Sequence, residues 1–136
     1  MNIHDVREWF RMADNDFDSA ILLNEAVRKH YEIICYHCAQ SVEKYLKGYL
    51  IYHNVIPQKT HDLFLLNNLC IEKDMDFRNI IFECNILKRF ANDIRYPNQY
   101  ETDEADVKIA VNAVEKIRNS TPILDVRYAI SNSDEE

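Results

Sequence analysis

The chain has 136 residues, with 16 Lys and Arg against 23 Asp and Glu, and a formal net charge of −7 at pH 7. Its length is that of a single domain able to bury its own core, and its acidic balance argues against broad binding to duplex nucleic acid. No apolar run approaches the roughly 18 residues of a membrane span, and the acidic Asp5 and Glu8 do not fit a signal peptide. We therefore expect a cytoplasmic protein.

The single glycine and three prolines are too few for the many tight turns of a β-sandwich or barrel, which favours an all-α fold. A capping box of Asp5 and Glu8 predicts the start of a first helix that runs to about residue 28. The second helix is predicted over residues 31–52. We expect these two helices to pack antiparallel to one another.

Three further helices follow in the prediction. Thr60 is expected to cap a short third helix that ends near residue 72. The fourth helix starts near Phe77 and must end before Pro97, because the residue before a proline is pushed out of helical angles. Thr102 is expected to cap the fifth. The expected fold is an up-and-down bundle of four long helices and one short helix, with these side chains in its core: Trp9, Phe17, Val42, Leu46, Ile81, Cys84, Ala91 and Ile109.

The bundle is expected to occupy residues 1–119. Thr121 and Pro122 then interrupt the helical pattern, so residues 120–136 are predicted to form a tail that is partly disordered. The sequence leaves the order of the apolar segment 123–130 undecided.

Four cysteines in a chain without secretory features are expected to stay reduced. Cys35 and Cys38 form a C-x-x-C, but both fall on the apolar face of the second helix and no second pair follows. We interpret them as core residues. No histidine pair has the spacing of a helical zinc site and no glycine-rich phosphate loop is present. We therefore expect neither a metal nor another cofactor.

The second helix also has a polar face, which combines an amide, a hydroxyl, an imidazole and a cation. Such a set suits a phosphate or a nucleobase. Gly48 lies on this face, and a glycine in mid-helix costs about 1 kcal/mol relative to alanine, so it indicates the close approach of a helix, a subunit or a ligand. Lys44 and Lys47 are one turn apart and could instead form only a solvated face. The residues of the polar face are His37, Gln40, Ser41, Lys44 and Gly48.

Arg95 is predicted to lie among apolar positions in the last turn of the fourth helix, where a charge needs a partner. Two interpretations stay open: the guanidinium satisfies the last carbonyls and the helix dipole, or it binds a phosphate with two prongs at the mouth of a pocket. His61 precedes Asp62, so its ring is either oriented by that carboxylate or exposed to solvent.

Four motifs occur in order: Trp9-x3-Ala13-Asp14, the run from Cys38 to Lys47 (CAQSVEKYLK), His61-Asp62-Leu63 and Arg95-Tyr96-Pro97. Over about residues 5–118 the chain thereby resembles the HEPN family (higher eukaryotes and prokaryotes nucleotide-binding domain). The resemblance implies a helical bundle that often dimerises and binds nucleotides or RNA. It also implies a neighbouring small nucleotidyltransferase as partner in a toxin-antitoxin-like pair.

Many members of this family are metal-independent endoribonucleases that use an arginine followed a few residues later by a histidine. In this chain the histidine is missing, and Tyr100 stands where it could be. A phenol with a pKa of about 10 is a poor base at neutral pH. The resemblance therefore implies binding rather than cleavage.

The first functional hypothesis is a homodimeric module that binds a nucleotide or RNA and acts with a nucleotidyltransferase partner. The alternatives are an endoribonuclease whose base is His37 or His61, and a protein-interaction module without a ligand. The expected binding residues are Arg95, Tyr96, Lys44, Lys47, Gln40 and His61, with no catalytic residue and no metal ligand among them.

Overall fold

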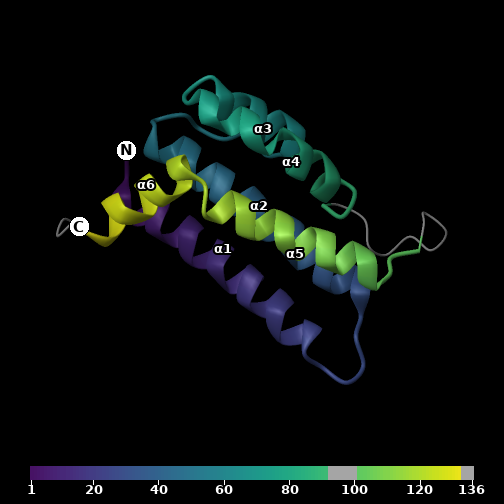
Figure 1. Ribbon diagram of the computed structural model, residues 1–136. Coiled ribbons are helices and arrows are strands. Elements are labelled where there is room, and N and C mark those ends of the chain that lie inside the picture. The colour runs from purple at the N-terminus through teal and green to yellow at the C-terminus, as the bar shows by residue number, and fades with distance from the viewer. Residues whose placement is uncertain (92–100, 133–136) are drawn as a thin grey trace.

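The computed structural model describes residues 1–91 and 101–132, and every regular element within these ranges is a helix (Figure 1). The prediction of an all-α fold is confirmed. None of the described helices combines the length and apolar character needed to cross a membrane. In chain order the elements are α1 (Ile3–Asn24), α2 (Tyr31–Tyr52), α3 (Leu63–Ile71), the 3₁₀ helix η1 (Met75–Ile80), α4 (Ile81–Lys88), α5 (Glu104–Arg118) and α6 (Thr121–Ser131).

The helix α2 lies at the centre of the bundle and contacts α1, α3, α4, α5 and α6. Figure 1 shows α1 antiparallel to α2, as predicted, with α3 and α4 on the opposite side and α6 across the end near the N-terminus. Because helices cover α2 from several sides, every residue from Cys38 to Leu50 is buried except Lys44, which is partly exposed. The predicted apolar face is confirmed, and most of the predicted polar face lies in the interior as well.

Gly48 marks a close approach of α1 to α2. A Cβ atom at this position would lie 2.8 Å from Phe10 Cδ1 and 3.1 Å from Trp9 Cβ. The prediction of a helix–helix contact at Gly48 is thus confirmed. Since the contact lies within one chain, Gly48 gives no support to a subunit interface.

The first helix begins earlier than predicted. The side chain of Asn2 accepts hydrogen bonds from the backbone N–H groups of His4 and Asp5, and this cap starts α1 at Ile3. The predicted capping box of Asp5 and Glu8 is therefore wrong. An asparagine is as good an N-cap as an aspartate, so the earlier of two suitable residues takes the role.

Two other predicted caps are displaced by one or two residues. Thr60 accepts a hydrogen bond from the backbone N–H of Asp62, and it is the Asp62 carboxylate that caps α3. At α5 the cap is Asp103 rather than Thr102, in a capping box with Asp106. A carboxylate is favoured at both places because it adds a charge interaction with the positive end of the helix dipole.

The predicted fourth helix is divided into η1 and α4. Asp74 accepts a hydrogen bond from the N–H of Asp76 and starts a tight turn. Phe77 and Ile80 are both buried and three residues apart, a spacing that brings side chains into line in a 3₁₀ helix. The interior contacts of this segment therefore suit the tighter helix.

The end of the fourth helix also differs from the prediction. The last residue of α4 is Lys88, and residues 89–91 form a turn and a bend instead of continuing the helix. Residues 92–100 include Arg95, Tyr96 and Tyr100 and lie outside the described residues.

The core combines most of α2 with the inward faces of the other helices. Of the expected core residues, Phe17, Val42, Leu46, Cys84 and Ala91 are buried, whereas Trp9 and Ile81 are partly exposed and Ile109 is 46% exposed. The prediction of Ile109 as a core residue of α5 is wrong: the buried residues of this helix are Val107, Ala110, Ala113, Val114 and Ile117.

The apolar segment whose order the sequence left undecided forms α6. Pro122 lies in its first turn, and Ile123, Val126 and Ile130 are buried. The helix contacts α1, α2, α5 and η1, and Arg7 Nε donates a hydrogen bond to the carbonyl of Ile130 at 3.0 Å. Residues 121–131 are therefore part of the bundle.

Candidate functional site

Glu43 on α2 is the centre of a polar cluster inside the bundle. Its side chain is 4% exposed and accepts a hydrogen bond from Lys47 Nζ at 2.9 Å. The ring of His61 lies with Nδ1 3.0 Å from Glu43 Oε1, and Gln40 Nε2 makes a longer contact of 3.5 Å. Residues 40, 43 and 47 share one side of α2 because they are three and four positions apart. We call Gln40, Glu43, Lys47 and His61 the Glu43 cluster.

The Glu43 cluster gathers three of the expected binding residues around a carboxylate that the sequence analysis did not select. The sequence around Glu43 does not indicate burial, because a glutamate between Val42 and Lys44 is equally typical of an exposed position on a helix. Its burial depends on neighbours that approach α2 from other parts of the chain. The segment before α3 brings His61, and the end of α4 approaches Gln40.

The cluster borders the end of α4. Gln40 Nε2 donates a hydrogen bond to the carbonyl of Ala91 at 3.3 Å, and Lys88 Nζ lies 3.4 Å from Asp62 Oδ1. Ala91 directly precedes the segment 92–100. The two remaining predicted site residues of that segment, Arg95 and Tyr96, lie outside the described residues.

His61 has an oriented but accessible ring. Its side chain is 62% exposed, while Nδ1 faces the Glu43 carboxylate. Neither expected interpretation is fully correct: the ring is exposed, and the carboxylate that orients it belongs to Glu43 rather than Asp62. A hydrogen bond from Nδ1–H to Glu43 leaves Nε2 available to another molecule.

Lys47 is held in the interior by two groups. Its side chain is 10% exposed, its ammonium pairs with Glu43, and it lies 5.7 Å from the centre of the Trp9 ring. The interpretation of Lys47 as part of a solvated face is wrong. An ion pair buried this way needs its partner, because an isolated charge in the interior is costly.

Lys44 belongs to a separate cluster that α2 forms with α1. Its ammonium forms an ion pair with Asp16 of α1, and His37 Nδ1 lies 3.0 Å from Asp16 Oδ1. The Lys44 side chain is 18% exposed. The structure thus separates Lys44 from Gln40, Lys47 and His61.

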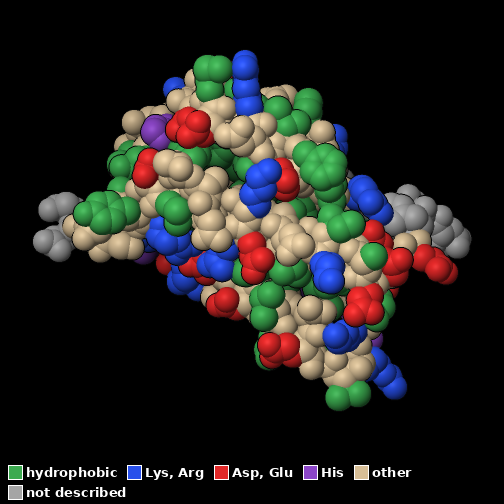
Figure 2. Space-filling model, in the orientation of Figure 1, with side chains coloured by type: hydrophobic (Ala, Val, Ile, Leu, Met, Phe, Trp, Pro, Cys, Tyr) green, Lys and Arg blue, Asp and Glu red, His purple; other side chains and the backbone are tan. Residues whose placement is uncertain are grey.

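A third polar cluster links four helices. Asp14 of α1 accepts hydrogen bonds from Arg127 of α6 at 2.7 and 3.0 Å and from Arg118 of α5 at 3.2 Å. The hydroxyl of Tyr45 on α2 also donates to Asp14. We call these residues the Asp14 cluster. Figure 2 shows Lys and Arg side chains gathered with Asp and Glu side chains over the start of α1, below α6.

The Asp14 cluster has shifted titration properties. Burial acts to raise the pKa of Asp14, but the hydrogen bonds from Arg127 and Tyr45 outweigh it and hold the pKa below its ordinary value. Burial and the bond to Asp14 raise the pKa of Tyr45 to about 12. The sequence analysis missed Arg118 and Arg127, because these arginines are 104 and 113 residues from Asp14 in sequence.

The four cysteines are free and buried. Burial raises the pKa of the Cys35 and Cys84 thiols to about 12. The interpretation of Cys35 and Cys38 as core residues is confirmed. Within residues 1–91 and 101–132 no group of three or more His, Cys, Asp or Glu side chains could hold a metal ion.

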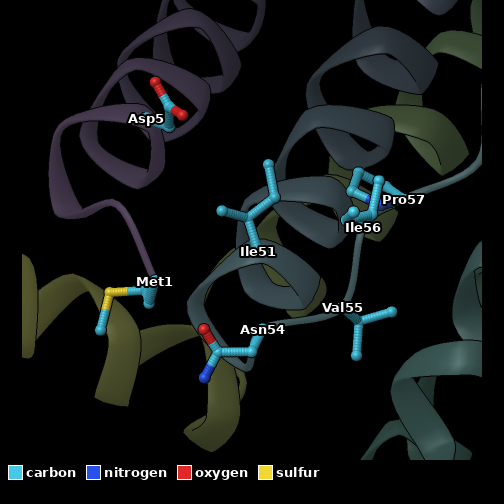
Figure 3. A pocket seen from close by; sticks show the side chains of 7 residues that line it. All are labelled: Met1, Asp5, Ile51, Asn54, Val55, Ile56 and Pro57. Atoms are coloured by element: carbon cyan, nitrogen blue, oxygen red, sulfur yellow. The ribbon is translucent and has the colours of Figure 1, made fainter.

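A pocket of about 360 Å³ lies apart from these clusters. Figure 3 shows it between the start of α1 and the segment that follows α2, with Met1, Asp5, Ile51 and residues 54–57 around it. Its lining is mostly apolar. None of the predicted site residues among the described ones lines it.

Comparison with known proteins gives the family of the chain. The family model described as HEPN domain matches residues 6–124. A comparison with curated proteins gave no match. The crystal structure of TT1696 from Thermus thermophilus is similar, with a TM-score of 0.72 and 18% identity over 90% of this chain and 96% of that one. The crystal structure of ST0689, an archaeal HEPN homologue, is similar with a TM-score of 0.66 and 23% identity over 92% and 97%. Because the family model covers most of the chain, the protein belongs to the HEPN domain family.

Proposed function

We propose that this HEPN domain binds a nucleotide or an RNA end through Gln40, Lys47 and His61 together with Arg95 and Tyr96. The observation that carries the proposal is the Glu43 cluster. It brings three of these residues together and makes a hydrogen bond to Ala91, directly before the segment with Arg95 and Tyr96.

The chemistry of these groups suits a nucleotide. An arginine can bind two phosphate oxygens at once, a tyrosine ring can stack on a base, and the accessible His61 ring can donate or accept a hydrogen bond. The net charge of −7 fits a small ligand or a chain end better than a long polymer, whose binding requires many cations.

Within this proposal Glu43 supports the site and does not contact the ligand. Its charge is balanced by Lys47 and its carboxylate holds the ring of His61. Lys44 is left out of the proposed contact surface, because it pairs with Asp16 and not with the Glu43 cluster that carries the proposal.

The test is a binding titration of ATP and of a short single-stranded RNA with the wild type and Arg95 variants. Arg95→Ala should weaken binding by at least about tenfold, and Arg95→Lys should restore little because an ammonium is a single point charge. Arg28→Ala, at an exposed position, is the matched control. Unchanged binding by Arg95→Ala would refute the proposal, as would unfolding of that variant without a separate loss of binding.

A second candidate function is metal-independent cleavage of RNA. It is favoured by the pair of Glu43 and His61, in which a buried carboxylate orients an exposed imidazole. An imidazole can take the proton from a 2′-hydroxyl near neutral pH, and a third group that orients the base is typical of proton-transfer sites. His61 would then take the role for which Tyr100 is unsuited.

An RNA cleavage assay in EDTA separates the two functions. The binding proposal predicts that the wild type leaves RNA intact. Cleavage that is lost in His61→Asn but kept in His37→Asn would instead establish the enzyme. His37 is a matched control because it also pairs with a carboxylate, that of Asp16.

We also propose that the domain forms a homodimer and binds a small nucleotidyltransferase. Both expectations come from the family. The exposed apolar side chains of Phe64, Met75 and Phe82, on α3, η1 and α4, offer a surface for such contacts. Sedimentation at tens of micromolar and co-purification with a nucleotidyltransferase encoded beside this chain test them. A monomer in sedimentation would contradict the proposed homodimer, and the absence of the nucleotidyltransferase from the purified protein would contradict the proposed partner.

A further inference from the structure

Another group of polar side chains surrounds a pocket of about 190 Å³ at the C-terminal end of α2. The pocket lies where α2 ends, η1 begins and α6 starts, and Figure 1 shows α6 crossing this end of the bundle. It shares no residue with the Glu43 cluster or the Asp14 cluster. Its polar lining residues are Tyr49, Tyr52, His53, Lys73, Asp74 and Asp125.

Most of these polar side chains have no hydrogen-bond or ion-pair partner in the part of the chain that the structure describes. The side chains of Tyr49, Lys73 and Asp125 form no hydrogen bond or ion pair with residues 1–91 or 101–132. Asp74 is engaged, because its carboxylate accepts the N–H of Asp76 at the start of η1. This differs from the three clusters described above, in which acidic and basic groups are paired with one another.

Tyr49 offers a hydrogen-bond donor at the pocket. The residue is 2% exposed, and its ring packs against His53 and Phe77 with centroids 4.4 and 4.6 Å away. Burial and the nearby Asp74 raise the pKa of its hydroxyl well above the ordinary value, so the group keeps its proton. The Tyr49 hydroxyl has no acceptor among the described residues, and Tyr49 lines this pocket.

The charges around the pocket have both signs. Asp74 and Asp125 are close enough to act on Tyr49, while Lys73 acts on His53. Burial and the Lys73 charge lower the pKa of His53, which keeps its ring neutral at pH 7. An anion alone would be repelled by the two carboxylates, and an amine alone would be repelled by Lys73. A molecule with a positive and a negative group can place each group near residues of the opposite charge.

We propose that this pocket binds a small zwitterion with an ammonium group and a carboxylate, such as a free amino acid. The ammonium group lies toward Asp74 and Asp125, and the carboxylate accepts hydrogen bonds from Lys73 and the Tyr49 hydroxyl. The rings of Tyr52 and His53 border the remaining space. A volume of about 190 Å³ suits such a ligand, since pockets for drug-sized molecules occupy roughly 300–1,000 Å³.

The test uses the full chain and the proteinogenic L-amino acids one by one, in ligand-observed NMR followed by calorimetry. For the amino acid that binds most tightly, two relatives are titrated: the methyl ester, which keeps only the ammonium group, and the N-acetyl derivative, which keeps only the carboxylate. Each should bind at least about tenfold more weakly than the parent. Binding of the ester as tight as that of the parent would show an amine site and overturn the proposal.

Variants locate the site on the protein. Asp125→Asn and Lys73→Gln, both at exposed positions, should weaken binding by at least about tenfold, as should Tyr49→Phe, which removes only the hydroxyl. Asp18→Asn and Lys108→Gln change the same residue types at exposed positions elsewhere and should bind like the wild type. No binding of any amino acid at about 10 mM, or equal binding by Asp125→Asn and Lys73→Gln, would overturn the proposal.

Discussion

Gly48 occupies a position where even one methyl group would meet a crowded surface. The neighbouring Phe10 is 1% exposed, and its ring packs edge-on against Tyr45 with centroids 5.3 Å apart. The guanidinium of Arg127 also lies over this ring, 5.5 Å from its centroid. Two effects oppose one another on substitution: alanine favours the helix by about 1 kcal/mol, while overpacking costs about 1–3 kcal/mol.

We expect Gly48→Ala to lower the free energy of unfolding by up to about 2 kcal/mol, measured by urea denaturation. Asn15→Ala, an exposed change on α1, is the control and should alter stability by no more than about 0.5 kcal/mol. A more stable Gly48→Ala protein would show that Phe10 yields without cost.

Asp14 makes stability depend on pH through its hydrogen bonds to two arginines and a tyrosine. Its pKa in the folded protein is below the ordinary value of 3.8, so the ionised carboxylate stabilises the fold above that pH. The stabilisation is lost as the pH falls through 3.8 toward the folded-state pKa. Since hydrogen bonds to charged groups contribute about 1.5–3 kcal/mol, their loss is measurable.

We expect Asp14→Asn to be less stable than the wild type by about 1–3 kcal/mol at pH 7, with the difference shrinking below about pH 4. Urea denaturation at several pH values measures this. Asp18→Asn, at an exposed position of the same helix, is the control. A stability difference between wild type and Asp14→Asn that stays constant down to about pH 3 would contradict the assigned role.

At the scale of the elements, α2 holds the bundle together, because it contacts α1, α3, α4, α5 and α6. Leu46 is fully buried on this helix, and truncating a buried leucine removes apolar contacts and leaves a cavity. We expect Leu46→Ala to lower the free energy of unfolding by about 2–5 kcal/mol. Leu22→Ala, at a position that is 69% exposed, should change it by no more than about 0.5 kcal/mol. Similar losses for both variants would refute the assignment of the two faces.

The sequence predicted best those elements whose own pattern decides their structure. The bounds of α2 follow from its apolar stripe and its flanking segments, and they were predicted correctly at Tyr31 and Tyr52. The break between η1 and α4 was missed, because helical periodicity from Phe77 to Leu87 continues through it. Pro122 was interpreted as an interruption, although a proline in the first turn of a helix is favourable.

Local sequence pattern and tertiary contacts also differ in how well they predicted the residues of the candidate site. Gln40, Lys47 and His61 carry polar groups that sequence motifs can select, and all three were among the expected binding residues. Glu43 was not selected because its burial results from the approach of α1, α3 and the end of α4. Ile109 was wrongly predicted to be buried for the same reason: Ile109 and Val107 are both apolar, and only the neighbouring helices decide that Val107 is buried.

At the scale of the whole molecule, the bundle encloses all four thiols. Reaction with a disulfide reagent requires the thiolate, and burial shifts the pKa of Cys35 and Cys84 to about 12. We expect the native protein to react slowly with Ellman's reagent at pH 8 and the denatured protein to react rapidly at all four cysteines. Fast reaction of the native protein would show that the bundle opens more readily than its packing indicates.

The burial of α2 from Cys38 to Leu50, with only Lys44 partly exposed, also limits which substitutions the protein can accept during evolution. Substitutions should accumulate on the outer faces of the other helices, while most replacements in α2 disturb either the core or a polar cluster. In a saturation-mutagenesis library selected for folded protein, we expect the α2 positions to tolerate the fewest amino acids. Identities of 18% and 23% with retained folds would then reflect drift confined largely to the periphery of the bundle.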